Sequence, residues 1–201
     1  MTENEKKNIQ LARKYLVEEK EQLALDCYKA VYDANEDNAE AAYWVYTALW
    51  QHYVDNNEES NVNKRNAFNA VSNTLVKAVK EIAASEGAKD EKVVITARFV
   101  GVYALVAAYV VKNPITDAST RIQLAVNTLY AAGNAIESAY GSNDPDSMIV
   151  ACMAWKDGVK LQQQFYAYSY DGNKAEDYVA KIQKHQPDYV MPKKAGCISV
   201  G

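Results

Sequence analysis

One long apolar stretch, from Val93 to Val111, constrains the fold of this chain more than any other part of the sequence. Within it only Thr96, Arg98 and Gly101 are neither aliphatic nor aromatic. A helix that is apolar on every side has to be buried on every side, either in lipid or inside a larger protein. We therefore expect the stretch to be a core helix or a membrane span.

Of these two alternatives, the sequence favours the core helix. The stretch is close to the about 20 residues that a span needs. Arg98, however, lies near its middle, where a charge costs roughly 2.5–3.5 kcal/mol on the insertion scale. Much of the remainder is alanine and tyrosine, which contribute little to insertion. We expect no membrane association, and we expect truncation of Phe99 or Leu105 to leave a cavity in the core.

Length and composition limit the protein classes to consider. The chain has 201 residues, of which 49% are hydrophobic, enough for one sizeable domain with its own core. A net charge of −4 argues against a dedicated nucleic-acid binder, which usually has a basic footprint. Cys27, Cys152 and Cys197 lie far apart, so we predict free thiols and no structural zinc site. The charged N-terminus lacks the apolar core of a signal peptide, and we expect a cytoplasmic location.

Apolar residues recur at spacings of three and four along almost the whole chain, and no convincing two-residue alternation appears. The pattern predicts an all-α fold of about seven to eight helices. A single helical domain is expected over about residues 1–186, followed by an extended or disordered tail over about 187–201, which could also lie in a groove. The expected helices cover about residues 4–18, 21–33, 39–54, 62–85, 90–113, 117–140, 145–168 and 174–185.

The first two helices resemble a tetratricopeptide repeat, a 34-residue helical hairpin with large and small residues at fixed places. Leu11, Ala12 and Tyr15 fall at the family's spacing on the first helix, and Ala24 and Tyr28 on the second. Two departures are Asn8, where the family prefers Trp, and Glu36, where it prefers Pro. A second half-repeat follows 34 residues later at Ala42, Val45, Tyr46 and Leu49. The resemblance covers about the first quarter of the chain.

This resemblance implies antiparallel hairpins stacked in a right-handed superhelix that binds a protein or a peptide. One variant of the family clamps a C-terminal carboxylate, and of the matching positions here only Arg13 could serve, so that ligand is disfavoured. The layout also looks, more faintly, like bacterial proteins in which such helices precede a glycine–cysteine box. Gly196 and Cys197 could begin such a box, although the zinc ribbon of those proteins is absent.

The expected third helix is rich in aromatic residues, among them Tyr43, Trp44 and Trp50. At 100° per residue, its core-facing stripe is predicted to be Ala42, Val45, Tyr46, Leu49 and Tyr53. Packing between neighbouring helices is one interpretation of the other rings. The functional interpretation is an aromatic-walled groove, because Trp and Tyr are typical interface anchors. The candidate partner-binding residues are therefore Arg13, Tyr43, Trp44 and Trp50.

An acidic stretch brackets this aromatic helix. Between Lys29 and Lys64 the chain has no Lys or Arg but several Asp and Glu residues. Such a charge distribution favours a basic partner and accelerates its encounter. Ordinary solvated loops would give the same pattern, and a homo-oligomer is left open.

Motifs for catalysis are lacking in the sequence. His52 and His185 have no Cys, Asp or His at ligand or triad spacing, and no glycine-rich phosphate loop occurs. We expect no catalytic residue, no metal and no cofactor. The leading hypothesis is a non-catalytic protein- or peptide-binding scaffold. The alternative is a helical-bundle protein or enzyme that binds a small molecule beside the 93–111 helix, with Arg98 as its anion anchor.

Overall fold

The computed structural model describes residues 1–56, 59–113, 118–165 and 172–195. Over these residues the chain is all-helical, with eight α-helices and no strand, which confirms the predicted class and helix number. The helices are α1 (Glu3–Val17), α2 (Glu21–Ala34), α3 (Ala39–Asp55), α4 (Asn61–Ala84), α5 (Lys89–Lys112), α6 (Ala118–Tyr140), α7 (Pro145–Gln164) and α8 (Gly172–His185).

Local sequence signals explain where several helices begin and end. Thr2 and Glu5 form a reciprocal capping box at the start of α1. The side chain of Asp144, just before Pro145, accepts from the backbone N–H of Ser147 at the start of α7. Gly87, in the turn after α4, has a φ of 120°, a conformation that favours glycine.

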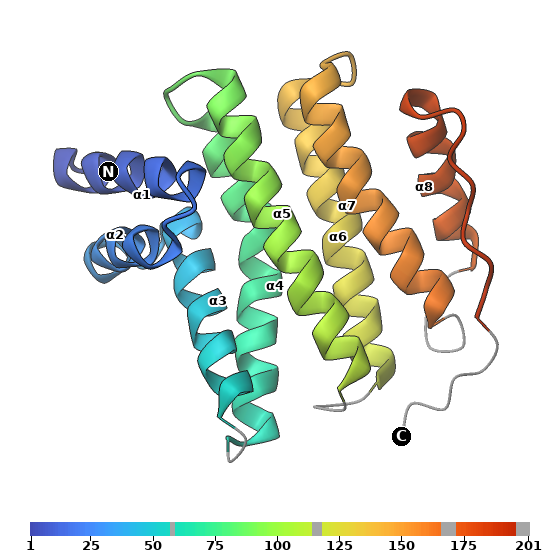
Figure 1. Ribbon diagram of the computed structural model, residues 1–201, viewed down its shortest axis with the longest axis horizontal. Helices are drawn as coiled ribbons and strands as arrows, with labels where there is room; N and C mark the ends of the chain where they lie inside the picture. The colour runs from blue at the N-terminus through green and yellow to red at the C-terminus, as the bar shows by residue number, and fades with distance from the viewer. Residues whose placement is uncertain (57–58, 114–117, 166–171, 196–201) are drawn as a thin grey trace. The chain divides into compact units, whose positions relative to one another are not determined.

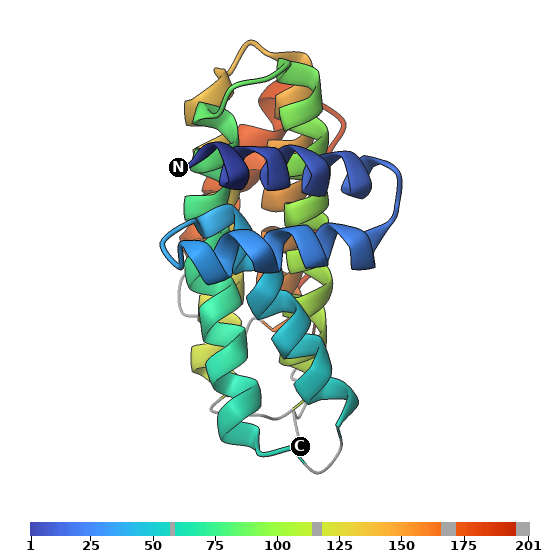
Figure 2. The same ribbon diagram turned by 90° about the vertical axis from the view of Figure 1, so that its left-hand side faces the viewer.

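The chain divides into two compact units, residues 1–99 and 100–201, with the division inside α5. The prediction of one domain over 1–186 therefore stays a prediction, as does the tetratricopeptide-like superhelix. In the first unit α1 packs against α2 and α3 against α4, and α2 also packs on α3. Figures 1 and 2 both show the α1–α2 hairpin running across the α3–α4 hairpin at a steep angle.

In the second unit α7 packs against both α6 and α8. α6 and α7 approach closely at Gly133, because a Cβ there would overlap the indole ring of Trp155 on α7. Gly158 of α7 faces the ring of Tyr130 on α6 in the same way. On each of the two helices, a glycine thus makes room for an aromatic ring of the other helix. The predicted core position of Cys152 is confirmed as well.

The apolar helix α5 differs from the expectation in one respect. Phe99 and Tyr103 are fully buried, as predicted, but Leu105 is 73% exposed and Val94 48% exposed. The prediction that this helix is buried on every side, with Leu105 in the core, is therefore wrong. Residue apolarity alone does not tell how many sides of a helix its neighbours cover.

The same helix is long and apolar enough to cross a membrane by length and composition, and within the described ranges it is alone in this. Half of its most apolar window is buried inside the protein. The core helix of a soluble protein passes this test too, so that the expectation of no membrane association stays a prediction.

Candidate partner-binding surface on helix α3

The four predicted partner-binding residues lie in the interior of the first unit. Arg13 is 5% exposed and Trp44 is 7% exposed, while Tyr43 and Trp50 are buried more completely. Packing, the other interpretation that the sequence allowed, accounts for their placement. That any of the four contacts a partner stays a prediction.

Arg13, the residue that the resemblance to a carboxylate clamp singled out, bonds to Glu40 of α3. Its Nε and Nη2 donate to Oε1 and Oε2 of Glu40 at 2.8 and 2.6 Å. The hydroxyl of Tyr28 donates to the same Oε1 at 2.9 Å. Both oxygens of a buried carboxylate are therefore bonded, as a charge in the interior requires. The guanidinium is committed to an internal partner rather than offered to a ligand.

Burial and charge shift the pKa values within this cluster. Burial of the guanidinium lowers the pKa of Arg13, but the hydrogen bonds and charge of Glu40 act the other way and together raise it. The pKa of Tyr28 lies well above its usual value, mainly because the ring is buried and also because the negative Glu40 stands beside it. With both pKa values raised, Arg13 stays charged and Tyr28 stays neutral over the physiological range.

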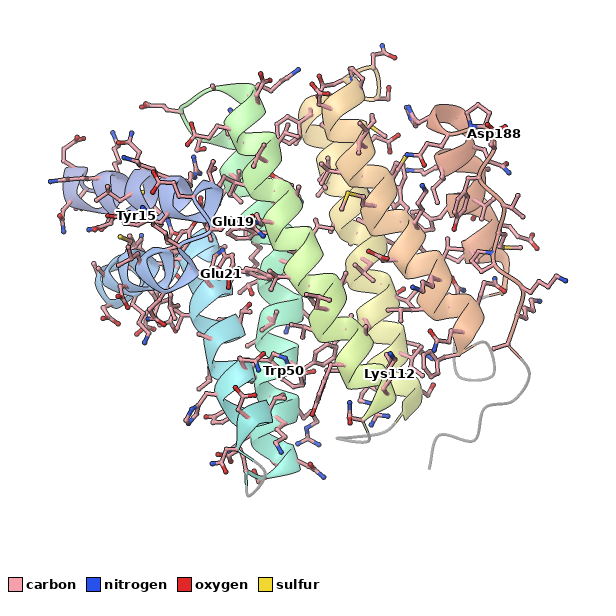
Figure 3. All side chains as sticks on the ribbon, viewed as in Figure 1. Tyr15, Glu19, Glu21, Trp50, Lys112 and Asp188 are labelled. Atoms are coloured by element: carbon pink, nitrogen blue, oxygen red, sulfur yellow. The ribbon has the colours of Figure 1, made fainter. Side chains whose placement is uncertain are left out.

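The three aromatic candidates on α3 pack against aromatic rings of α4 and α5. Tyr43 stacks on Phe99 of α5 with centroids 4.7 Å apart, and its hydroxyl donates to the Phe99 carbonyl at 2.8 Å. Trp44 meets the same phenyl ring edge-on at 5.6 Å. Trp50, labelled in Figure 3, packs against Phe68 of α4 with centroids 6.3 Å apart. These rings tie α3 to α4 and α5 and leave little of themselves at the surface.

The outer side of α3 carries the residues that the sequence had assigned to the core. Leu49 is 38% exposed, and Val45, Tyr46 and Tyr53 are partly exposed. They recur at spacings of three and four and therefore share one face of the helix. Except for the buried Ala42, the predicted core-facing stripe is wrong. We refer to Val45, Tyr46, Leu49 and Tyr53, with Tyr32 of α2, as the α3 surface.

Tyr32 joins α2 to this surface. Its hydroxyl lies 3.1 Å from that of Tyr46, and the two rings meet edge-on with centroids 5.7 Å apart. The hydrogen bond to Tyr46, together with partial burial, raises the pKa of Tyr32 to about 12. The hydrogen bond and the edge-on ring contact thus hold Tyr32 of α2 against Tyr46 of α3.

Acidic side chains stand at both ends of the α3 surface. Asp33, Glu36 and Asp37 are exposed at the end of α2 and in the turn before α3, and Asp55 is exposed at the end of α3. An apolar and aromatic strip with negative charge at its two ends suits a partner that is itself partly apolar and basic.

Arg98 also has a partner within the first unit. Its Nη2 lies 3.3 Å from Oε1 of Glu19, which Figure 3 labels in the connection between α1 and α2. The pair is largely exposed, so its contribution to stability is small. The sequence suggested Arg98 as an anchor for an anionic ligand, and nothing in the pattern pointed to Glu19. Gly196 and Cys197, the possible start of a glycine–cysteine box, lie outside the described residues.

Comparison with known proteins identifies no relative of this chain. The chain matches no protein-family model, no curated protein and no solved structure.

Proposed function

We propose that the chain is a non-catalytic protein- or peptide-binding scaffold of the tetratricopeptide-like class, and that its partner docks on the α3 surface. The observation that carries this proposal is one face of α3 on which Leu49 is 38% exposed and Tyr46 and Tyr53 are partly exposed, beside the hydrogen-bonded Tyr32–Tyr46 pair. Contiguous apolar surface on a folded domain marks interaction sites, and tyrosine is a frequent anchor in them.

The charge around the surface supports the class of partner. With Asp33, Glu36 and Asp37 at one end and Asp55 at the other, a basic segment would be attracted before contact. The apolar strip between them would then supply the short-range contact. A partner with basic residues flanking one or two large apolar side chains fits this arrangement.

The runner-up, a small-molecule site beside α5 with Arg98 as the anion anchor, has less support. The carboxylate of Glu19 lies against the Arg98 guanidinium and would compete with an anionic ligand. The scaffold needs no such displacement, because the α3 surface is open as it stands.

The proposal is tested by one substitution and its matched control. Leu49→Asp places a charge within the α3 surface, and Leu23→Asp places the same charge on a leucine of α2 with 45% exposure. Proteins captured from the native cells by the wild-type chain are purified, and their affinity for both variants is measured. We expect Leu49→Asp to weaken binding at least tenfold, since a charge would lose its water in the contact.

Leu23→Asp should change the affinity less than about twofold, because a lone exposed leucine is ordinary protein surface. Equal affinity of both variants for every captured partner would contradict the proposed site.

A further inference from the structure

The residues that follow α8 lie against the helices of the second unit. Residues 186–195, which we term the strap, run back along α8 and end beside the last turn of α7 (Figure 1). Asp188, labelled in Figure 3, stands in the turn with which the strap begins. One alternative from the sequence was that this segment lies in a groove. In the structure, hydrogen bonds and a cation–π contact hold the strap against α7 and α8.

Side chains of α7 and α8 hold the strap as they would hold a separate peptide. Nε2 of Gln183 donates to the backbone carbonyl of Tyr189 at 3.0 Å. Nζ of Lys156 lies 5.2 Å from the centre of the Tyr189 ring, within the range of a cation–π contact. The backbone N–H of Ala195 donates to the carbonyl of Gln163 at 3.1 Å. That carbonyl belongs to the last turn of α7, where carbonyls lack a donor within the helix.

In its central part, residues 189–191, the strap alternates as an extended peptide does. Tyr189 and Met191 lean on the helices and are partly buried, whereas Val190 between them is 81% exposed. Successive side chains of an extended chain point to opposite sides, so every second residue is read by the surface beneath. Pro187 and Pro192 restrict the backbone and reduce the entropy lost on docking. Recognition of this kind depends on spacing and on main-chain hydrogen bonds.

One contact beneath the strap is poorly matched. Gln163 is 2% exposed, and among the described residues its Nε2 donates to the sulfur of Met191 alone, at 3.5 Å. A thioether is a weak acceptor. The Oε1 of the same amide is buried and has no hydrogen-bond partner among the described residues. The surface therefore presents an amide that the strap's own methionine cannot satisfy.

From these contacts we infer that the face formed by Lys156 and Gln163 of α7 and Gln183 of α8 is a binding site for an extended peptide of another protein, which the strap occupies in its absence. The preferred ligand has an aromatic residue at the place of Tyr189 and a Gln or Asn two residues later. A carboxamide there would both accept from Nε2 and donate to Oε1 of Gln163. This site is distinct from the α3 surface, so that either proposal can fail without the other.

The geometry also explains how a weak contact can keep the strap docked. A short tether gives the strap an effective concentration on the order of millimolar at its own site. A peptide from another molecule binds only the fraction of sites that the strap leaves open, and its apparent Kd rises accordingly. A better match at Gln163 is what would let a ligand displace it.

The test uses the full chain and two labelled ten-residue peptides, followed by fluorescence anisotropy. One peptide has the sequence of residues 186–195, and the other carries Met191→Gln. In the protein, Tyr189→Ala with Met191→Ala weakens the strap, and Val190→Ala is the matched control at an exposed position of it. We expect the double variant to bind the first peptide at least tenfold more tightly than the wild type or Val190→Ala does.

The second peptide should bind both the wild type and the double variant about tenfold more tightly than the first, since two hydrogen bonds are gained. Gln163→Leu in the protein should abolish that preference. The wild-type comparison remains informative if the double variant does not fold.

Three results would overturn the inference. The first is that neither peptide binds. The second is that the wild type and the double variant bind the first peptide equally tightly. The third is that the preference for the Met191→Gln peptide persists in the Gln163→Leu protein. Wild-type dimers that the first peptide dissociates would instead make a second copy the occupant and overturn the choice of partner.

Discussion

Arg13 and Glu40 show how single residues decide the character of the first unit. Their side chains are 6% and 3% exposed, and each of the two oxygens of the carboxylate accepts a bond from the guanidinium. A second carboxylate, that of Glu81, accepts from the backbone N–H groups of Ala39 and Glu40 at the start of α3. Burial raises the pKa of Glu81, a shift that these two hydrogen bonds partly offset. Through these bonds Arg13, Glu40 and Glu81 hold α1, α3 and α4 together.

Breaking this pair from one side should cost more than removing both partners. Arg13→Met leaves the Glu40 carboxylate buried and uncompensated, and we expect a loss of about 3–5 kcal/mol in the free energy of unfolding. Arg13→Met with Glu40→Met removes both charges and should lose distinctly less. Urea denaturation of the single and double variants measures the difference. A double-variant loss equal to the sum of the two single losses would show that the charges are not coupled.

The buried phenol of Tyr28 predicts a loss of stability in alkali. Its folded-state pKa is raised above the unfolded value of about 10, mainly by burial. Between the two values the folded state holds a proton that the unfolded state has released, so the free energy of unfolding falls as pH rises. This contribution is complete below about pH 10 and is lost above it.

Tyr28→Phe should make the decline above about pH 10 shallower, even though it removes the hydrogen bond to Glu40 and lowers stability at neutral pH. Denaturation curves between pH 8 and about pH 11 give the two slopes. An unchanged slope would mean that Tyr28 ionises with its ordinary pKa.

Among the elements, α3 shows most clearly what the sequence could and could not predict. Its boundaries follow from the Asn38 cap and from the polar run after Asp55. Its rotation about its own axis was predicted wrongly, because apolar and aromatic residues occupy both sides of the helix. Trp44 and Thr47 face inward and Leu49 faces outward, since the buried side is chosen by the aromatic partners on α2 and α5.

Helices with one apolar stripe were predicted correctly. On α4, residues such as Phe68, Val71 and Leu75 are fully buried or nearly so, as their spacing indicated. The candidate site could not be predicted in the same way. Leu49 and Tyr53 have the composition of core residues, and only the placement of the neighbouring helices reveals that they are uncovered.

The sequence predicted a core position for both Phe99 and Leu105, but the structure predicts different effects for their truncation. Phe99→Ala should lower the free energy of unfolding by about 3–5 kcal/mol, because the ring is fully buried against Tyr43. Leu105→Ala should stay within about 0.5 kcal/mol, since its side chain is 73% exposed. Thermal and urea denaturation of both variants tests the difference. A large loss from Leu105→Ala would mean that this side of α5 is covered in solution.

The α6–α7 crossing makes a prediction with a built-in control. A Cβ at Gly158 would stand 2.6 Å from a ring carbon of Tyr130, so that Gly158→Ala should destabilise by about 1–3 kcal/mol through overpacking. Gly133→Ala should do the same against Trp155. Gly101→Ala meets no atom within 4 Å and should instead stabilise α5 by about 0.5–1 kcal/mol. Loss of stability in all three variants would argue against a specific close approach.

At the scale of the whole molecule, we propose two separate partner-binding surfaces, one in each unit. The α3 surface of the first unit is open and flanked by acidic residues, while the peptide face of the second unit is filled by the strap. The two proposals differ in their response to salt. Raising the ionic strength should slow association at the α3 surface, because screening removes the long-range attraction of a basic partner.

The proposal of a binding scaffold rests on contact at the α3 surface, and site-specific photo-crosslinking measures that contact most directly. A benzophenone amino acid replaces Leu49 in one protein and Leu23 in another, and both are irradiated in the cells that make the natural chain. We predict a discrete crosslinked protein from position 49 and none from position 23. No crosslink at position 49, or the same crosslinked protein from both positions, would contradict a partner docked on α3.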